Sequence, residues 1–197
     1  MSGTTTFFMQ MAAGKKRPYR RRLNYLESTG TQYIDTGLTD YVNDHRYRIV
    51  NTVAFTYGSS THQTGANGVL QVTYQAGYFG ISAGSMPYNI SVGAVFTYEE
   101  YGGSSSTTTL VVDGVSQTRT WTSNFGGNLL LFALKASNNV INYAKMRCYE
   151  LKVYSNANNS LVQDLIPVLD WSDVPCMYDQ VSGSLFYNAG SGTFDYA

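Results

Sequence analysis

The absence of a helical hydrophobic period is the feature that most limits how this chain can fold. From Leu23 to Ala197 the sequence consists of short segments rich in Val, Ile, Thr, Tyr and Phe, which are separated by Gly, Asn, Asp and Ser. The first group of residue types favours strands, and the second favours turns. Some ten strands with frequent turns and no alternation with helices predict an all-β antiparallel sandwich or jelly roll.

Residue type and spacing also predict individual strands in the first half of the chain. The candidate strands lie at residues 46–57, 68–76, 77–84 and 89–101. Beyond them, Asp113 and Gly114 stand between two apolar-rich segments, which is the strongest short-range signal for a β-hairpin. We therefore expect two paired strands on either side of this dipeptide.

The second half of the chain predicts three further features. The continuous apolar run at residues 128–136 predicts a central strand that is covered on both faces. Residues 176–194 predict two short closing strands around a Val-Ser-Gly turn. In residues 145–155 a period of two predicts one face with Tyr149, Leu151 and Val153, and an opposite face with Cys148, Glu150, Lys152 and Tyr154.

Length and composition indicate one folded domain. The chain has 197 residues, of which 17 are Tyr and only 13% are charged, which describes a Tyr-rich, weakly charged globular protein. Cys148 and Cys176 form no CxxC motif, so we expect buried free thiols, with a single disulfide as the alternative. No apolar run approaches the roughly 18 residues that cross a bilayer, so we expect a soluble protein without a membrane partner.

The charge is distributed unevenly along the chain. Residues 1–22 contain six basic residues and no acidic one, whereas the remainder contains seven basic and 13 acidic residues. Such asymmetry indicates a tail that binds a partner, and the alternative is a solvated, disordered terminus. We therefore expect a basic N-terminal arm at residues 1–22 and one domain at residues 23–197. The basic residues of the arm are Lys15, Lys16, Arg17, Arg20, Arg21 and Arg22.

The arm also has an apolar patch, which consists of Phe7, Phe8, Met9 and Met11. A docking peptide buries side chains such as Phe and Met, and Arg pairs with acidic or phosphate groups. A nucleic-acid arm would need only the charge, so the patch favours docking to other proteins, with DNA or RNA as the alternative. The apolar patch precedes the basic run, which is the reverse of a signal peptide, so we expect no export by that route.

Three separated motifs resemble one family. Residues 23–38, LNYLESTGTQYIDTGL, resemble the opening of the concanavalin-A-like, laminin-G-like jelly-roll domains found in bacteriophage and gut-bacterial surface proteins. Residues 129–170 are similar to the late strands of this family, and residues 175–194 to its closing hairpin. The resemblance spans residues 23–197 and implies a concanavalin-A-like jelly roll. Gln163 stands where the family usually has an arginine, so an ion pair at this position is not implied.

The opening motif also has a structural interpretation of its own. A period of two places Thr31, Tyr33 and Asp35 on one side and Gln32, Ile34 and Thr36 on the other, with Gly30 and Gly37 ending the strand. We expect this strand to pair with the late strands near Leu151. That pairing would bring both ends of the domain to one side and leave the opposite rim for a ligand.

The sequence lacks the patterns of common enzymes. Glycoside hydrolysis needs two carboxylates at a defined separation, and the glucanases of the resembled fold carry them at alternate positions of one strand. Here Glu99 and Glu100 are adjacent and so point to opposite faces, and Glu150 stands alone. His45 and His62 show no metal-ligand spacing. We therefore expect neither enzymatic activity nor a required cofactor.

The resemblance implies calcium as one further ligand. Some laminin-G-like domains hold calcium through Asp, Asn and backbone carbonyl oxygens on a rim loop. Asp40, Asn43 and Asp44 are the weak candidates for such a site here. The alternative is that these residues serve as ordinary turn residues.

The aromatic middle section predicts a glycan-binding site. Sugars present apolar C–H faces that stack on Tyr and Trp, while side-chain amides bond their hydroxyl groups. We predict stacking on Tyr78, Tyr88 and Trp121, with Asn89 as the hydrogen-bonding partner. The alternative is that these rings fill a Tyr-rich core.

These observations lead to one functional expectation and two alternatives. We expect a bacteriophage virion accessory protein, a capsid decoration or fibre-associated module made in the host cytoplasm, that displays a lectin-like or adhesion face. Its arm would bind other virion proteins in a multimeric assembly, and its face would bind host or mucosal glycans. The first alternative is a purely structural capsid protein whose arm binds neighbouring subunits or genome, and the second is a glucanase-like enzyme.

Overall fold

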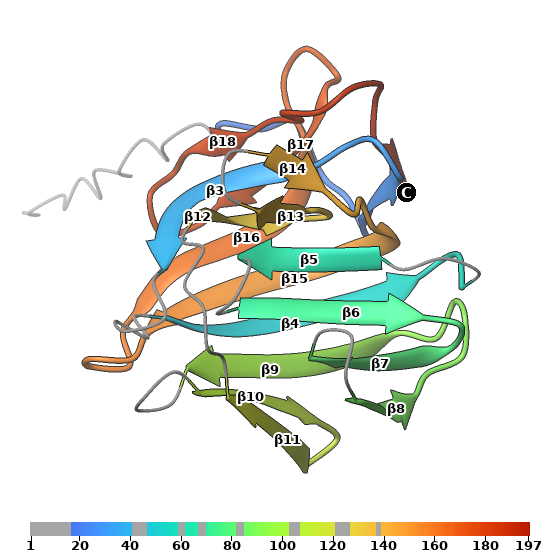
Figure 1. The fold of residues 1–197 in the computed structure, drawn as a ribbon. Coiled ribbons are helices and arrows are strands. Elements are labelled where there is room, and N and C mark those ends of the chain that lie inside the picture. The colour runs from blue at the N-terminus through green and yellow to red at the C-terminus, as the bar shows by residue number, and fades with distance from the viewer. Residues whose placement is uncertain are drawn as a thin grey trace, which may run out of the picture.

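The computed structural model describes residues 17–40, 47–58, 62–66, 70–81, 85–102, 107–120, 127–136 and 139–197. The described residues form strands and turns and contain no helix. The strands form two sheets that lie one in front of the other (Figure 1). The predicted all-β fold with antiparallel sheets is confirmed. The arm residues Phe7, Phe8, Met9, Met11, Lys15 and Lys16 lie outside the described residues.

The rear sheet in Figure 1, here called sheet A, has eleven strands. Its main path runs in the order β11-β10-β9-β4-β15-β16-β17-β18, with β1 beside β16 and β2 between β15 and β19. Its strands are β1 (Arg21–Arg22), β2 (Leu26–Thr29), β4 (Tyr47–Phe55), β9 (Phe96–Gly102), β10 (Thr107–Val112), β11 (Val115–Thr120), β15 (Lys145–Ser155), β16 (Leu161–Leu169), β17 (Pro175–Asp179), β18 (Leu185–Phe186) and β19 (Asp195–Tyr196).

The front sheet, sheet B, has eight strands. Its main path runs in the order β14-β13-β5-β6-β7-β8, and β12 joins β3 to β5. All described pairs are antiparallel except β13 with β5. Its strands are β3 (Ile34–Asp40), β5 (His62–Ala66), β6 (Leu70–Gln75), β7 (Tyr78–Ile81), β8 (Ser85–Asn89), β12 (Gly127–Leu131), β13 (Leu134–Ala136) and β14 (Asn139–Ile141).

The core lies between the two sheets and is rich in aromatic rings. Phe55 of sheet A stacks on Tyr74 of sheet B with ring centroids 4.3 Å apart. Phe79 of sheet B meets Phe96 and Tyr98 of sheet A at 5.0 and 5.1 Å. Burial of such large rings is a major source of stability in a sandwich of this size. The core therefore uses several tyrosines of the middle section, which was the alternative to a binding role.

The predicted hairpin at Asp113–Gly114 is confirmed. The dipeptide connects β10 to β11, whose register runs without a break from Thr107–Thr120 to Val112–Val115. Both turn residues have positive φ, 49° and 79°, as a type I′ turn requires. The two closing strands are confirmed as well, since β17 and β18 pair on either side of the Val-Ser-Gly segment.

The prediction of one central strand at residues 128–136 is wrong. Phe132 has a φ of +73°, which breaks the apolar run into β12 and β13. Its ring is buried and packs against Phe194 with centroids 5.1 Å apart. The break turns the chain so that β12 pairs antiparallel with β3, while β13 runs parallel to β5.

The predicted alternation in residues 145–155 holds only on each side of a β-bulge. The register with β4 shifts between Cys148 and Glu150. Strict alternation would place Cys148 and Leu151 on opposite faces, because they are three residues apart. The bulge adds one residue between them, so both side chains face the core. The assignment of Cys148 to the face opposite Leu151 is therefore wrong. Cys148 and Cys176 are both buried free thiols, as expected.

The opening motif forms a turn between the two sheets. β2 pairs with residues Lys145–Cys148 of β15, whereas β3 pairs with β12 in the other sheet, so the motif strand does not pair near Leu151. The burial of Gln32, Ile34 and Thr36 confirms the predicted alternation. Gly30 ends β2 at a φ of +111°, but Gly37 lies inside β3, where the register with β12 shifts.

Residues 17–22, here called the clasp, contact sheet A. The Arg20 N–H donates to the Leu169 carbonyl at 2.9 Å, and β1 continues this pairing along β16. The Tyr19 ring lies 5.0 Å from that of Tyr178, over an apolar cluster on the outer side of sheet A. Residues 17–22 therefore pack on the domain, and the boundary at Leu23 stays a prediction.

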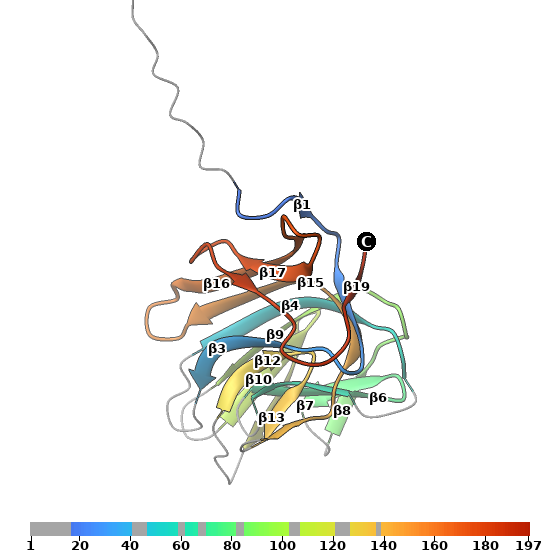
Figure 2. The same ribbon diagram turned by 90° about the horizontal axis from the view of Figure 1, so that it is seen from above.

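The chain ends lie together, as the sequence predicts. β19 pairs with β2, and the Asn24 N–H donates to the Ala197 carbonyl. The clasp and the pairing of β19 with β2 lie on the sheet A side of the molecule (Figure 2). Sheet B faces the opposite direction, so a ligand on its outer side would meet no part of the clasp.

Candidate functional site

The candidate site lies on the outer face of sheet B and begins with a polar stripe on β6. Val72 and Tyr74 point into the core. Because side chains alternate along a strand, Gln71, Thr73 and Gln75 point away from the core, but Gln71 and Thr73 are buried and only Gln75 is exposed.

Glycines flank this stripe on the neighbouring strands. Gly65 of β5 is directly opposite Gln71, and Gly80 of β7 is directly opposite Thr73. Paired residues point to the same face, so no side chain stands beside the stripe at these two positions. Glycine inside a strand commonly marks a place where a ligand or another backbone approaches closely.

Gln71 is the unusual residue of the stripe. Its side chain is only 4% exposed, and its Oε1 accepts no hydrogen bond within the described part of the chain. Its backbone N–H donates to Glu100 Oε1 at 2.8 Å, which fixes the strand at this point. Buried polar atoms normally have partners, so the unpartnered amide oxygen of Gln71 is an exception among the described residues.

Tyr78 provides an exposed ring at the end of the stripe. It directly follows the Ala76–Gly77 turn, where positive φ at both residues builds a two-residue hairpin. Tyr78 is opposite Gln75 on one side and Asn89 on the other. The Tyr78 side chain is 49% exposed, and Gln75 and Asn89 are exposed as well. The structure therefore brings together the predicted pair Tyr78 and Asn89 and adds two glutamines.

Tyr88 is not part of this surface, which corrects the prediction. Its side chain is 8% exposed and packs against Phe79 with ring centroids 6.4 Å apart. Its hydroxyl donates to the Val115 carbonyl at 2.7 Å, and burial raises its pKa. Adjacent residues of a strand point to opposite faces, so Tyr88 and Asn89 cannot share one. Trp121 lies outside the described residues.

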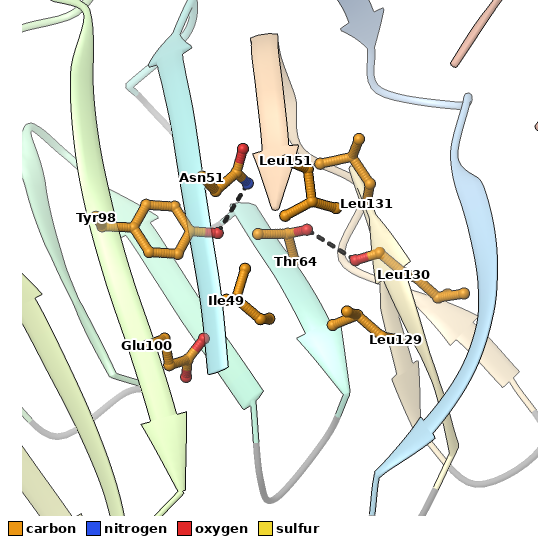
Figure 3. A pocket seen from close by; sticks show the side chains of 9 residues that line it. All are labelled: Ile49, Asn51, Thr64, Tyr98, Glu100, Leu129, Leu130, Leu131 and Leu151. Carbon is orange, nitrogen blue, oxygen red and sulfur yellow. Dashed lines mark hydrogen bonds between the residues drawn. The ribbon is translucent and has the colours of Figure 1, made fainter. Parts of the chain in front are cut away.

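A small cavity between the sheets offers no site for a sugar. It measures about 10 Å³, the space of one water molecule. Asn51 Nδ2 donates to the Tyr98 hydroxyl at 3.0 Å, and the Thr64 hydroxyl donates to the Leu130 carbonyl at 2.9 Å (Figure 3). Burial raises the pKa of Tyr98, so this phenol stays protonated.

The carboxylates named from the sequence point apart. Glu99 pairs with Arg48 at 3.1 Å on the outer side of sheet A, whereas Glu100 is buried toward sheet B. Their opposite directions are as predicted for adjacent strand residues. Glu150 pairs with Lys152 at 2.7 Å. His62 lies in β5, and His45 lies outside the described residues.

The calcium candidates are not brought together within the described part of the chain. Asp40 is the last residue of β3, and Asn43 and Asp44 lie outside the described residues. No group of three or more acidic, His or Cys side chains suited to a metal occurs among the residues that the structure describes. The neighbouring Asp35 accepts bonds from Asn128 Nδ2 at 3.0 and 3.1 Å. Calcium binding stays a prediction.

Gln163 takes a structural position. It is buried, and its Nε2 donates to the Thr36 carbonyl at 2.9 Å, which joins β16 of sheet A to β3 of sheet B. An inter-sheet hydrogen bond therefore occupies the place where the resembled family carries an arginine. None of the described segments is a helix long and apolar enough to pass through a membrane.

Comparison with known proteins gives one structural match. No protein family matches the sequence, and no curated protein is significantly similar to it. The fold is similar to the crystal structure of "a putative carbohydrate binding protein from Bacteroides ovatus ATCC 8483", with a TM-score of 0.57 and 10% sequence identity. The match covers 90% of this chain and 60% of that one, so this chain spans less than two thirds of the neighbour. The two proteins share an all-β architecture.

Proposed function

We propose that this chain is a carbohydrate-binding module of a bacteriophage virion and that it binds glycans on the outer face of sheet B. The observation that carries the proposal is the exposed ring of Tyr78 between the exposed side-chain amides of Gln75 and Asn89. The ring offers an apolar plane, and the amides bond hydroxyl groups. Sugars need both kinds of contact.

Each residue of the site has a separate role in this proposal. A pyranose ring stacks on Tyr78, and Asn89 and Gln75 on either side bond its hydroxyl groups. Gly80 and Thr73 are buried, so the contact with the glycan is confined to the exposed end of the hairpin. The site binds its glycan without cleaving it, and it requires no metal or other cofactor.

Two further observations support the proposal. The fold is similar to that of a protein described by others as carbohydrate-binding, although the low identity makes this a likeness of fold. The motifs in residues 23–38, 129–170 and 175–194 resemble concanavalin-A-like jelly-roll domains of bacteriophage and gut-bacterial surface proteins. We propose the jelly-roll type and the virion location on the strength of this resemblance.

The arm serves as the anchor in this account. The clasp lies on the sheet A side, so we propose that a particle that holds residues 1–16 displays sheet B outward. Individual glycan sites on exposed sheets are weak. Many copies on one particle raise the effective concentration and make capture efficient.

A glycan array tests the proposal. The full chain, biotinylated at its N-terminus and displayed on tetravalent streptavidin, should bind a subset of host and mucosal glycans. Tyr78→Ala should abolish the signal because a stacked ring contributes about 1–3 kcal/mol to binding. Tyr196→Ala, a change at an exposed tyrosine of β19, is the matched control and should bind as the unmodified chain does. Equal binding by the two variants would refute the site, and no binding by any form would refute the function.

A further inference from the structure

A second exposed tyrosine lies beside the proposed site, at the ends of the sheets. Tyr57 follows β4, and its side chain is 46% exposed. Lys145, the first residue of β15, holds its Nζ 4.4 Å from the centre of the Tyr57 ring. A cation over an aromatic ring is attracted by the electrons of the ring, so the two side chains hold each other in place.

Lys145 is held from its other side as well. Its Cε lies 3.0 Å from the position that a Cβ of Gly30 would occupy, so the side chain crosses the bare backbone of the opening motif. No carboxylate pairs with Lys145 within the described part of the chain. The ammonium group is thus a positioned positive charge without a counter-charge, although the chain beyond residue 22 carries more acidic than basic residues.

Backbone contacts join this pair to the Tyr78 hairpin. The Ala76 N–H donates to the Gly58 carbonyl at 2.7 Å, and the Ile90 N–H donates to the Gly77 carbonyl at 2.8 Å. A Cβ on Gly58 would lie 3.0 Å from Val92 Cγ2, so only glycine allows this close approach. Tyr57 and Tyr78 therefore lie on either side of the backbone contact between Gly58 and the Ala76–Gly77 turn, where the half-exposed Val92 side chain covers Gly58.

We infer that the glycan site continues over this backbone to Tyr57 and ends in a subsite for an acidic sugar, whose anionic group pairs with Lys145. This inference rests on the proposed function and specifies its ligand class. Tyr57 offers an apolar plane to the sugar ring, and Lys145 offers a charge-assisted hydrogen bond to its anionic group. The anionic group is the carboxylate of a uronic or sialic acid or the sulfate of a sulfated sugar.

The test compares matched acidic and neutral glycans. The probes are sialylated, uronate-containing and sulfated oligosaccharides, each printed beside its neutral parent, and the full chain is displayed on streptavidin. We expect at least one acidic series to bind about fivefold more tightly than its parent at low salt, the range of a single exposed ion pair. Comparison of the carboxylate-containing series with the sulfated series shows which of the two anionic groups Lys145 binds.

Two variants of Lys145 identify the charge. Lys145→Met keeps the aliphatic contact with Gly30 and should remove the preference for acidic glycans, whereas Lys145→Arg should keep it. Tyr57→Ala should weaken binding of the acidic glycan and leave that of a single neutral sugar unchanged. A preference that survives Lys145→Met, or that is absent in the unmodified chain, would overturn the inference.

The outcomes separate this inference from the proposed function. If Tyr78→Ala abolishes neutral-glycan binding while Lys145→Met changes nothing, the sheet B site stands and the acidic subsite is wrong. If Tyr78→Ala leaves neutral-glycan binding intact, the proposed function itself is wrong. If acidic glycans bind through Lys15 and Lys16, deletion of residues 1–16 removes the preference and Lys145→Met does not, and the inference is again overturned.

Discussion

Gln32 is the residue around which the opening motif folds. Its side chain is buried between β2 and β3, where Oε1 accepts from the Thr29 N–H at 2.9 Å and Nε2 donates to the Thr193 carbonyl at 3.0 Å. It thereby ties the motif to the C-terminal loop, where a Cβ on Gly190 would lie 2.1 Å from the Thr31 carbonyl oxygen. The run of Ser, Thr, Gly and Gln thus fixes the turn between β2 and β3 to the C-terminal loop, which we call a structural lock. The period of two in the sequence predicts only which of these side chains are buried.

Replacing Gln32 should therefore be costly. Gln32→Leu keeps the volume but leaves a buried N–H and a buried carbonyl without partners, each of which costs about 1–3 kcal/mol. We expect the free energy of unfolding, measured by urea denaturation, to fall by about 2–4 kcal/mol. Gln180→Leu, at an exposed glutamine with one side-chain bond to Asp164, is the control and should change stability little. Equal effects of the two changes would show that Gln32 is no lock.

Gln71→Leu, in contrast to Gln32→Leu, should not lower the free energy of unfolding. The change removes a buried acceptor that has no partner in the described structure, so stability should stay equal or rise by about 1 kcal/mol. Glycan affinity should stay within about twofold, because the buried amide is out of reach of a ligand. Thermal melting and glycan binding measured on the same preparation check both. A loss of stability without a loss of binding would place Gln71 among the structural residues.

Asp170 predicts how stability depends on pH. Its Oδ1 accepts from the Val174 and Ser172 N–H groups at 2.9 and 2.8 Å, and its Oδ2 accepts from the Tyr187 hydroxyl at 3.0 Å. The bond from Val174, with the others, lowers the pKa of Asp170 below its ordinary value of 3.8. Its contribution is therefore present above pH of about 4 and is lost as the pH falls through the lowered value.

Asp170→Ala should accordingly cost about 1–3 kcal/mol at pH 7 and progressively less below pH 4. Melting curves of the variant and the unmodified chain from pH 7 to pH 2.5 measure this difference. Asp113→Asn in the exposed hairpin turn is the control, since Asn is equally suited to positive φ. A deficit for Asp170→Ala that stays constant with pH would contradict the role of the charge.

At the scale of elements, local rules predict some features and tertiary contacts decide others. The Asp113–Gly114 hairpin and the alternation around Ile34 follow from turn chemistry and a period of two. The bulge after Cys148 and the break at Phe132 could not be predicted from the sequence, because they depend on which strands pair with β15, β12 and β13.

The candidate site shows the same division. Tyr78 and Asn89 lie opposite each other because β7 and β8 are consecutive strands of one hairpin. Tyr88 and Asn89 point to opposite faces because they are adjacent residues of one strand. Gln71 could not be found from the sequence, because its importance depends on which face of β6 meets the core and on how deeply the amide is buried. Lys145 gains its position only when β15 and the loop after β4 come together.

The clasp is the element that bears most directly on the expected domain boundary. Tyr19 covers Ile166, Val168 and Cys176 on the outer side of sheet A, so removing the clasp exposes an apolar cluster. We expect deletion of residues 1–22 to lower the melting temperature, since loss of the Tyr19 ring alone costs about 2–4 kcal/mol. Deletion of residues 1–16 keeps the clasp and should melt closer to the full chain. Indistinguishable melting of the two deletions would show that the domain begins at Leu23.

At the scale of the whole molecule, the clasp and the proposed binding face lie on opposite sides. The clasp is attached to the outer side of sheet A, and Tyr78 lies on the outer side of sheet B, whose strands lie on the far side of sheet A from the clasp (Figure 2). This arrangement suits a module that is held by one end and binds with the other. It also separates the two functions, so that changes on sheet B should leave particle attachment intact.

The central claim is that the outer face of sheet B binds glycan, and NMR titration tests it most directly. The full chain, labelled with nitrogen-15, is titrated with the strongest glycan from the array, and amide shifts are mapped onto the sequence. The account predicts shifts confined to residues 71–81 and the neighbourhood of Asn89, which extend to Tyr57 and Lys145 only for an acidic glycan. Shifts confined to the outer face of sheet A, around Arg48, Arg147 and Tyr154, would contradict it.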